Sequence, residues 1–300
     1  MHSSQALLTG LIDYAGLFPP ANLLMAHAVS NYASYCKGQH GWILGRFIVP
    51  VSRLDEFESA AKEFLLPGDH GTPWRLSALA GRDLEDDLVR LAEFNRLHAD
   101  TLKMGAAVVD AIEITVSTVE DIRRVTGIVP TRYETYLEIP INDELTSLIS
   151  AIAAAGVRAK VRTGGITQDM FPSTADVARF LHECAESHVR FKATAGLHHA
   201  IRSVRKLTYE QNSPSGIMHG FMNVFLAAAF LSTGMDVNEA IIMLEEQRHG
   251  AFRFDDDAVS WRDRQISGET LVRVRREFAI AFGSCSFLEP IAELKAMNLL

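Results

Sequence analysis

The fold is decided by Lys160-Val161-Arg162-Thr163-Gly164-Gly165 and by Phe191-Lys192-Ala193-Thr194-Ala195-Gly196-Leu197-His198-His199. In both segments apolar and cationic residues alternate, and each segment then runs into glycine. This pattern is typical of a buried strand that carries polar side chains to the mouth of a barrel and then turns. Because a helical stretch separates the two segments, they predict strands of a β/α fold, and we expect the functional site at their ends.

The same alternation of strand and helix extends over almost the whole chain, which is typical of repeated βα units around a parallel sheet. We predict strands at 11–15, 42–50, 74–80, 108–116, 133–140, 157–162, 189–194 and 251–255. Helices are predicted at 22–35, 54–65, 84–97, 119–125, 144–155 and 174–187. Eight such units predict one α/β domain over residues 1–300, a TIM (β/α)8 barrel, which typically takes ~250 residues.

An open doubly wound sheet is the alternative fold. It would more often carry a glycine-rich phosphate turn after its first strand, and residues 13–20 do not form one. Two helical stretches, 217–231 and 237–247, lie between the seventh and eighth predicted strands, where a plain barrel has one helix. We expect this extra helix to form a lid or an oligomer contact.

Composition narrows the class of protein. The chain is 48% hydrophobic and 22% charged with a net charge of −8, and no block of like charges indicates a nucleic-acid surface. Its three cysteines, Cys36, Cys184 and Cys285, form no paired motif, which favours a reducing cytoplasm. The N-terminus shows no secretion signal, and the most apolar run, 221–231, is too short to span a bilayer. We expect a small-molecule partner and neither nucleic acid nor membrane, while the apolar helices are compatible with a homo-oligomer.

Side chains of a barrel strand alternate between the helices and the barrel axis, so the apolar set of each strand should face the helices. This rule turns polar side chains inward on strand after strand, where a plain core would use Val, Ile and Leu. The inward set is Glu113, Thr115, Tyr136, Glu138, Arg158, Lys160, Arg162, Arg190, Lys192 and Thr194, with Arg46, Arg253 and Asp255 from the second and eighth strands. A structural ion-pair network would use the same residue types, but charge on four adjacent strands favours a site.

Two neighbouring buried lysines can support Schiff-base chemistry. Desolvation and like charge both disfavour the ammonium form, so Lys160 and Lys192 are expected to lower each other's pKa. A neutral amine can attack a carbonyl carbon while Glu113 or Glu138 transfers protons.

Lys160-Val161-Arg162-Thr163-Gly164 and Phe191-Lys192-Ala193-Thr194-Ala195-Gly196 resemble the paired lysine strands of deoxyribose-phosphate aldolase and its class I aldolase relatives. The resemblance implies that Lys160 forms the Schiff base and that Lys192 tunes it. That family carries a catalytic aspartate on strand four in a Val-Asp context, which Val109-Asp110 matches. Alternation points Asp110 outward, so the acid role stays open between Asp110, Glu113 and Glu138. The family binds phosphate after strand eight, where residues 254–257 here are acidic and would repel it.

These arguments predict a lyase or aldolase-type enzyme that acts on a small anionic carbonyl compound and needs no cofactor or metal. The predicted catalytic residues are Lys160, Lys192, Glu113 and Glu138. The predicted substrate-binding residues are Arg46, Arg162, Thr163, Gly164, Gly165, Thr194, His198 and Arg253.

Two alternatives remain open from the sequence. His198, His199 and His219 with the strand carboxylates could make a divalent-metal isomerase or hydrolase, although the neighbouring cations would repel a metal ion. A barrel that binds a metabolite without catalysis is the second alternative. Cys285 is interpreted as an inert thiol, since a nucleophile would need a histidine nearby in space.

Overall fold

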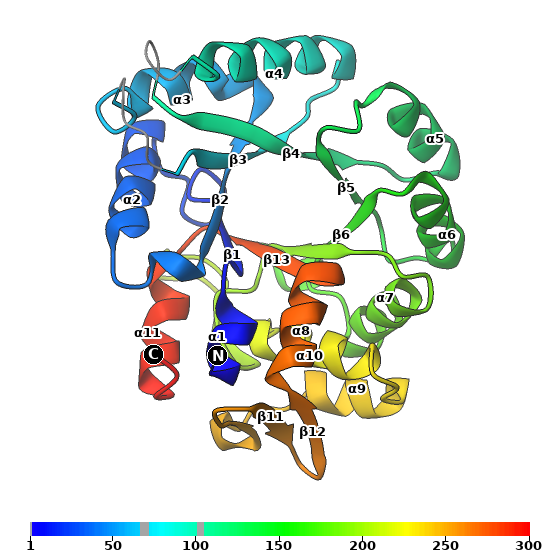
Figure 1. The fold of residues 1–300 in the computed structure, drawn as a ribbon. Helices are drawn as coiled ribbons and strands as arrows, with labels where there is room; N and C mark the ends of the chain where they lie inside the picture. The colour runs from blue at the N-terminus through cyan, green and yellow to red at the C-terminus, as the bar shows by residue number, and fades with distance from the viewer. Residues whose placement is uncertain (1, 67–71, 101–104) are drawn as a thin grey trace.

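Eight parallel strands close into a barrel in the computed structural model, which describes residues 2–66, 72–100 and 105–300 (Figure 1). Around the barrel the order is β1, β13, β7, β6, β5, β4, β3 and β2, each hydrogen-bonded in parallel to the next. The strands are β1 Ile12–Tyr14, β2 Leu44–Pro50, β3 Trp74–Leu79, β4 Ala107–Thr115, β5 Glu134–Glu138, β6 Arg158–Arg162, β7 Phe191–Thr194 and β13 Ala279–Ser284. The predicted TIM barrel is therefore confirmed.

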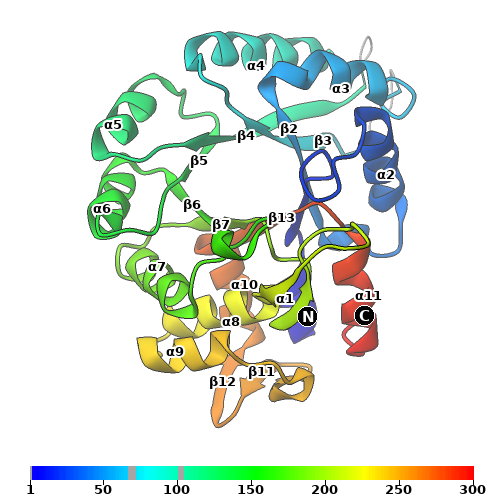
Figure 2. The same ribbon diagram turned by 180° about the vertical axis from the view of Figure 1, so that it is seen from behind.

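Helices surround the barrel on its outside (Figures 1 and 2). They are α1 Ser3–Leu8, α2 Met25–Lys37, α3 Leu54–Ala61, α4 Leu84–His98, α5 Val119–Ile128, α6 Leu145–Ala155, α7 Thr174–Glu186, α8 Phe221–Leu231, α9 Val237–Leu244, α10 Gly268–Glu277 and α11 Leu288–Ala296. Short 3-10 turns are η1 Gly41–Ile43, η2 Val51–Arg53, η3 Gln168–Met170 and η4 His249–Ala251. Several helices begin at a side-chain cap: Ser173 accepts a hydrogen bond from the backbone N–H of Asp176, as the sequence indicates. No helix among the described residues combines the length and apolarity that crossing a membrane requires.

The predicted strand at 251–255 forms, but its predicted place as the eighth strand of the barrel is wrong. Residues 252–254 form β10 Phe252–Phe254, which pairs antiparallel in a three-stranded sheet with β11 Ala258–Trp261 and β12 Arg264–Ser267. The strand that closes the barrel is β13, which pairs in parallel with β1 and with β7. The short segment Phe252–Phe254 alternates apolar and cationic residues as the other barrel strands do, whereas Ala279–Ser284 does not, so alternation alone favoured the wrong segment.

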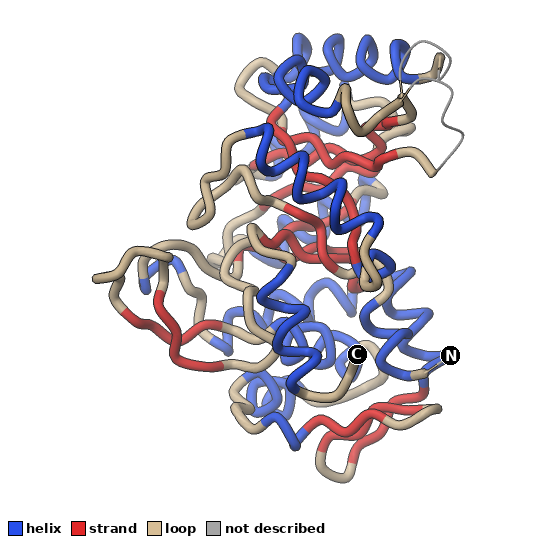
Figure 3. The backbone as a smooth tube through the Cα atoms, turned by 90° about the vertical axis from the view of Figure 1, so that its left-hand side faces the viewer, coloured by secondary structure: helices blue, strands red, loops and turns tan. Residues whose placement is uncertain are grey.

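The chain between β7 and β13 carries additional elements. A hairpin of β8 Ser203–Lys206 and β9 Ser215–Met218 follows β7 and projects from one end of the barrel (Figure 3). Helix α8 packs against β13 and α7, while α9 packs against α7 and α8. The three-stranded sheet then leads into α10, which lies against α1 and β13.

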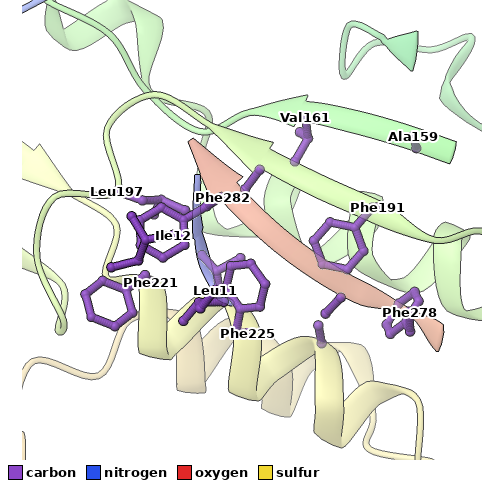
Figure 4. Close-up of a cluster of buried hydrophobic side chains, with 14 of the residues drawn as sticks. Leu11, Ile12, Ala159, Val161, Phe191, Leu197, Phe221, Phe225, Phe278 and Phe282 are labelled. Atoms are coloured by element: carbon purple, nitrogen blue, oxygen red, sulfur yellow. The ribbon is translucent and has the colours of Figure 1, made fainter. Parts of the chain in front are cut away.

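Aromatic side chains fill the layer between α8 and the barrel (Figure 4). Phe225 stacks against Phe191 of β7 with ring centroids 6.1 Å apart and lies 5.8 Å from the ring of Phe282 in β13. Phe221 stacks on Phe282 at 5.1 Å. Every residue of α8 is buried, which explains why this helix is apolar at every position except Asn223.

Val161, in the same buried layer, offers a test of this packing. Val161 is fully buried on β6, whereas Val89 on α4 is 68% exposed. We expect Val161→Ala to lower the free energy of unfolding by about 2–3 kcal/mol through lost burial and the cavity left behind. Val89→Ala, the same chemical change at the surface, should stay within about 0.5 kcal/mol. Urea denaturation of both variants measures the difference, and equal effects would contradict the packing described.

Candidate active site

The inner face of the barrel differs from strict alternation at β4. Leu76 of β3 pairs with Val109, whereas the next residue, Ser77, pairs with Ala111, so β4 contains one extra residue at Asp110. Such a bulge lets consecutive residues share a face. The Asp110 carboxylate contacts the inward Arg46, which corrects the expectation that Asp110 points outward.

Glu113 joins the two predicted lysines at the centre of the barrel. Its Oε1 lies 2.6 Å from Nζ of Lys192, and its Oε2 lies 2.7 Å from Nζ of Lys160. All three side chains are at most 5% exposed. The hydroxyl of Ser77 also donates to Glu113 Oε1 at 2.6 Å.

Two more carboxylates complete this group. Glu138 Oε2 is 2.7 Å from Nζ of Lys160, and Asp13 Oδ2 is 2.5 Å from Nζ of Lys192. We call the five residues Asp13, Glu113, Glu138, Lys160 and Lys192 the central ion-pair cluster. All four predicted catalytic residues belong to it, so the structure brings them into direct contact.

The cluster fixes the charge of its buried members. Burial alone would raise the pKa of Glu113, but the ammonium groups of Lys160 and Lys192 outweigh it and hold that pKa far below its usual range. Burial alone would lower the pKa of Lys192, yet Asp13 and Glu113 raise it above the ordinary value. The expectation of a depressed pKa therefore does not hold for Lys192, because its carboxylate partners outweigh the effect of burial.

A cavity of about 300 Å³ opens at the C-terminal ends of the strands, directly above the cluster. This is the end at which TIM-barrel active sites lie. Lys160, Glu113 and Glu138 line it, whereas Lys192 does not and is 1% exposed. The other residues lining the cavity include Phe18, Pro19, Ile48, Leu79, Thr115, Arg162, Ile166, Met170, Thr194, His198 and Cys285.

The predicted substrate-binding residues divide into two groups. Arg162, Thr194 and His198 line the cavity. Arg162 is 46% exposed and reaches Glu138 Oε1 at 3.3 Å, so its guanidinium stands at the cavity's polar edge. Thr163 instead uses its hydroxyl to donate to the carbonyls of Thr194 and Ala195, which ties the loop after β6 to the end of β7.

Gly164 and Gly196 lie where the loops after β6 and β7 touch. A Cβ on either residue would come within 2.8 Å of the other's Cα, closer than side-chain carbons approach a backbone. Gly196 also has φ +75°, which favours glycine. Gly165 packs against Met170. None of these three glycines lines the cavity; Gly164 and Gly196 allow the two loops to approach each other closely, beside the lining residues Ile166 and Ala195.

Arg46 lies in a second charged layer toward the N-terminal ends of the strands. Its guanidinium donates to Asp110 at 2.6 Å and to Glu134 at 2.8 Å, and Arg75 and Arg158 pair with the same two carboxylates. Burial alone would lower the pKa of Arg46, but these carboxylates raise it. Arg46 faces inward as expected, yet it does not line the cavity beside Lys160.

Arg253 is separated from the site altogether. It lies exposed on β10 of the three-stranded sheet, so its predicted position on the inner face of the barrel, with that of Asp255, is wrong. The acidic residues 255–257 follow the same strand and do not border the cavity. The turn that follows the last barrel strand is Ser284-Cys285-Ser286.

The histidines considered as metal ligands make separate contacts. His199 Nδ1 lies 2.7 Å from Glu293, and His219 Nε2 donates to the carbonyl of Pro172 at 2.8 Å. Asn223 donates to the carbonyls of Met243 and Glu246, at the end of α9. Among residues 2–66, 72–100 and 105–300, no three His, Cys, Asp or Glu gather in a way that could hold a metal ion.

The sequence prediction missed two residues of this site. Asp13 belongs to the central ion-pair cluster, and Ser77 donates a hydrogen bond to Glu113 of the cluster. Asp13 lies between Ile12 and Tyr14 in a predicted strand, and its backbone neighbour Arg46 donates an N–H to its Oδ1 at 2.6 Å. A lone carboxylate inside an apolar strand was a usable signal for Asp13. Ser77 gave none, because a serine in a strand is common at either face.

The chain matches no model of a known protein family, and no curated protein is significantly similar to it in sequence.

Alanine substitutions at Gly196 and Gly156 distinguish the cost of steric contact from the cost of backbone strain. Gly156 caps α6 with φ +67° and has open space around its missing Cβ, so Gly156→Ala should cost about 1–2 kcal/mol. Gly196→Ala adds the contact with Gly164 and should cost about 3 kcal/mol or more. Chemical denaturation measures both; equal losses would mean that the two loops do not touch.

His219 should make stability fall in mild acid. Burial is the main cause that lowers its pKa from 6.5 to about 4, and its ring accepts from Arg202 while donating to Pro172. Below pH 6.5 this histidine is protonated in the unfolded chain but still neutral in the folded protein. The free energy of unfolding therefore falls as the pH falls toward 4. The free energy of unfolding of the wild type exceeds that of His219→Gln by an amount that should fall by about 3 kcal/mol between pH 7 and pH 4. The exposed His27→Gln is the control, and a constant difference for His219→Gln would refute the argument.

Proposed function

We propose that the protein is a lyase or aldolase-type enzyme that acts on a small anionic carbonyl compound through a Schiff base on Lys160. One observation carries the proposal: Nζ of Lys160 lies in the cavity wall, 2.7 Å from each of two carboxylates. An amine that is held in a nearly dry cavity with carboxylates in contact has both a substrate space and a proton acceptor.

Lys160 is the nucleophile in this proposal because it is the lysine that borders the cavity. Its proton passes to a carboxylate, and the neutral amine adds to the carbonyl carbon. The carbonyl oxygen then takes up protons and leaves as water, which forms the imine. Apolar side chains such as Phe18, Ile48 and Leu79 border the same space and limit the water around that bond.

Glu138 is the residue that we assign to proton transfer. Two ammonium groups hold Glu113 ionised, so it is a poor proton carrier. Glu138 contacts Lys160 at 2.7 Å and the half-exposed Arg162 at 3.3 Å, and it is 14% exposed, against 1% for Glu113. Proton exchange with substrate or solvent is therefore easier at Glu138.

Lys192 has an electrostatic role in this scheme. It lies beneath the cavity, between Asp13 and Glu113, and 5.0 Å from the ring centre of Tyr136. Its permanent charge balances the buried carboxylates when Lys160 becomes neutral. Without it, Glu113 would be left as an unpaired buried anion, which is strongly unfavourable.

Arg162 is the group that we assign to the substrate's anionic end. It is the arginine bordering the cavity among the described residues, and it is half exposed beside Glu138. A guanidinium suits a carboxylate or phosphate through paired hydrogen bonds. The cavity volume of about 300 Å³ favours a small substrate. The resemblance of the two lysine strands to class I aldolases supports the same assignment.

Borohydride trapping tests the nucleophile. We expect reduction in the presence of small aldehydes, ketones and keto acids to leave one adduct, which peptide mapping locates on Lys160. Lys160→Arg should abolish that adduct, because arginine keeps the positive charge between Glu113 and Glu138 but is not deprotonated at neutral pH.

Lys206→Arg is the matched control, since Lys206 lies on the exposed hairpin and donates to the carbonyl of Gln211. The adduct should persist in that variant. An adduct that survives Lys160→Arg, or none with any compound of the panel, would overturn the proposal. Metal content measured on the same preparation tests the metal alternative.

A further inference from the structure

A second group of reactive side chains borders the cavity. Cys285 follows β13 directly, and His198 lies in the loop after β7; both line the same space as Lys160. Glu289 of α11 and Tyr209 of the loop between β8 and β9 complete the group. The sequence places these residues far apart, so only the closed barrel brings them together.

The contacts centre on the imidazole of His198. Its Nδ1 lies 3.9 Å from Sγ of Cys285 and 3.4 Å from Oε2 of Glu289. The hydroxyl of Tyr209 donates to the same Glu289 oxygen at 2.9 Å and lies 3.7 Å from Sγ. Among the described residues no hydrogen bond reaches Nε2 of His198, so this nitrogen is free for a ligand.

The positive charge of His198 can stabilise a neighbouring thiolate. Burial alone would lower its pKa, but the contacts with Cys285 and Glu289 outweigh burial and raise the pKa to about 9. The imidazole therefore carries a proton at neutral pH. An imidazolium beside a thiol stabilises the negative sulfur that acts as a nucleophile.

The other two thiols lack this environment. Cys184 is fully buried in α7, and burial raises its pKa well above the usual value. Cys36 lies at the surface in α2, but partial burial raises the pKa of its thiol to about 11. Cys285 differs from both because it is 5% exposed yet borders a cavity that a small molecule can enter.

We propose that Cys285 is a second nucleophile of the cavity, which adds reversibly to the carbonyl carbon of a small aldehyde with His198 as the proton donor. The thiolate forms a carbon–sulfur bond, and the carbonyl π electrons move to oxygen. That oxygen takes the proton of His198 and becomes the hydroxyl of a thiohemiacetal. The step neither needs nor consumes an oxidant.

This inference goes beyond the Schiff base and does not depend on it. Cys285 and Lys160 border one cavity, so the same class of carbonyl compound can meet either group. The thiol site can therefore be tested in Lys160→Arg, where no imine forms at residue 160.

The test is alkylation by iodoacetamide at pH 7, followed by peptide mapping of Cys36, Cys184 and Cys285. We expect Cys285 to react faster than Cys36, and folded His198→Gln to lower the alkylation rate of Cys285 at least about tenfold. In Lys160→Arg, acetaldehyde should slow alkylation of Cys285 and leave Cys36 unchanged.

His199→Gln is the matched control, because His199 contacts Glu293 instead of Cys285. It should leave the rate at Cys285 unchanged, and circular dichroism of each variant verifies that it is folded. The proposal is overturned if Cys285 reacts no faster than Cys36, if folded His198→Gln keeps the wild-type rate, or if acetaldehyde gives no protection. If borohydride trapping fails but Cys285 shows the expected alkylation and protection, only the Schiff-base proposal is rejected.

Discussion

One carboxylate, that of Glu113, holds the centre of this barrel together. Each of its oxygens contacts a different lysine, Lys160 or Lys192, from neighbouring strands. Three charged groups this deeply buried would each be very unfavourable alone, and removal of one partner of such a group typically costs about 3–5 kcal/mol. Their positions are therefore linked, because the strands that carry them must keep their register. The same register fixes the positions of the side chains that line the cavity.

The interior is built in two charged layers with different tasks. Toward the N-terminal ends of the strands, Arg46 is enclosed by Asp110 and Glu134, and no side chain of this group borders the cavity. Toward the C-terminal ends, Lys160 and Glu138 have one side open to it. The first layer borders a separate pocket, lined among others by Arg46, Glu134 and Arg158. The two layers therefore differ in the groups that they present, since only the second places a lysine, Lys160, beside the cavity at the C-terminal ends.

The segment between β7 and β13 connects the fold to the site. The all-buried helix α8 covers β7 and β13 with aromatic side chains, which fixes the two strands after which His198 and Cys285 follow. From the hairpin after β7, Tyr209 reaches Glu289 and the thiol. Through Tyr209 the inserted hairpin therefore contacts Cys285, which itself borders the cavity.

The sequence by itself determined the βα repeat and the contact residues Lys160, Lys192, Glu113 and Glu138. Period-two alternation records which side chains leave the apolar layer, so the pattern is local and can be read along one strand. Only the tertiary structure decided which segment closes the barrel, since β10 has the alternation expected of a barrel strand but pairs with β11, whereas β13 pairs with β7. The bulge at Asp110 and the approach of His198 to Cys285 also depend on pairing between distant segments. Such contacts are set by the closure of the sheet, which no local period encodes.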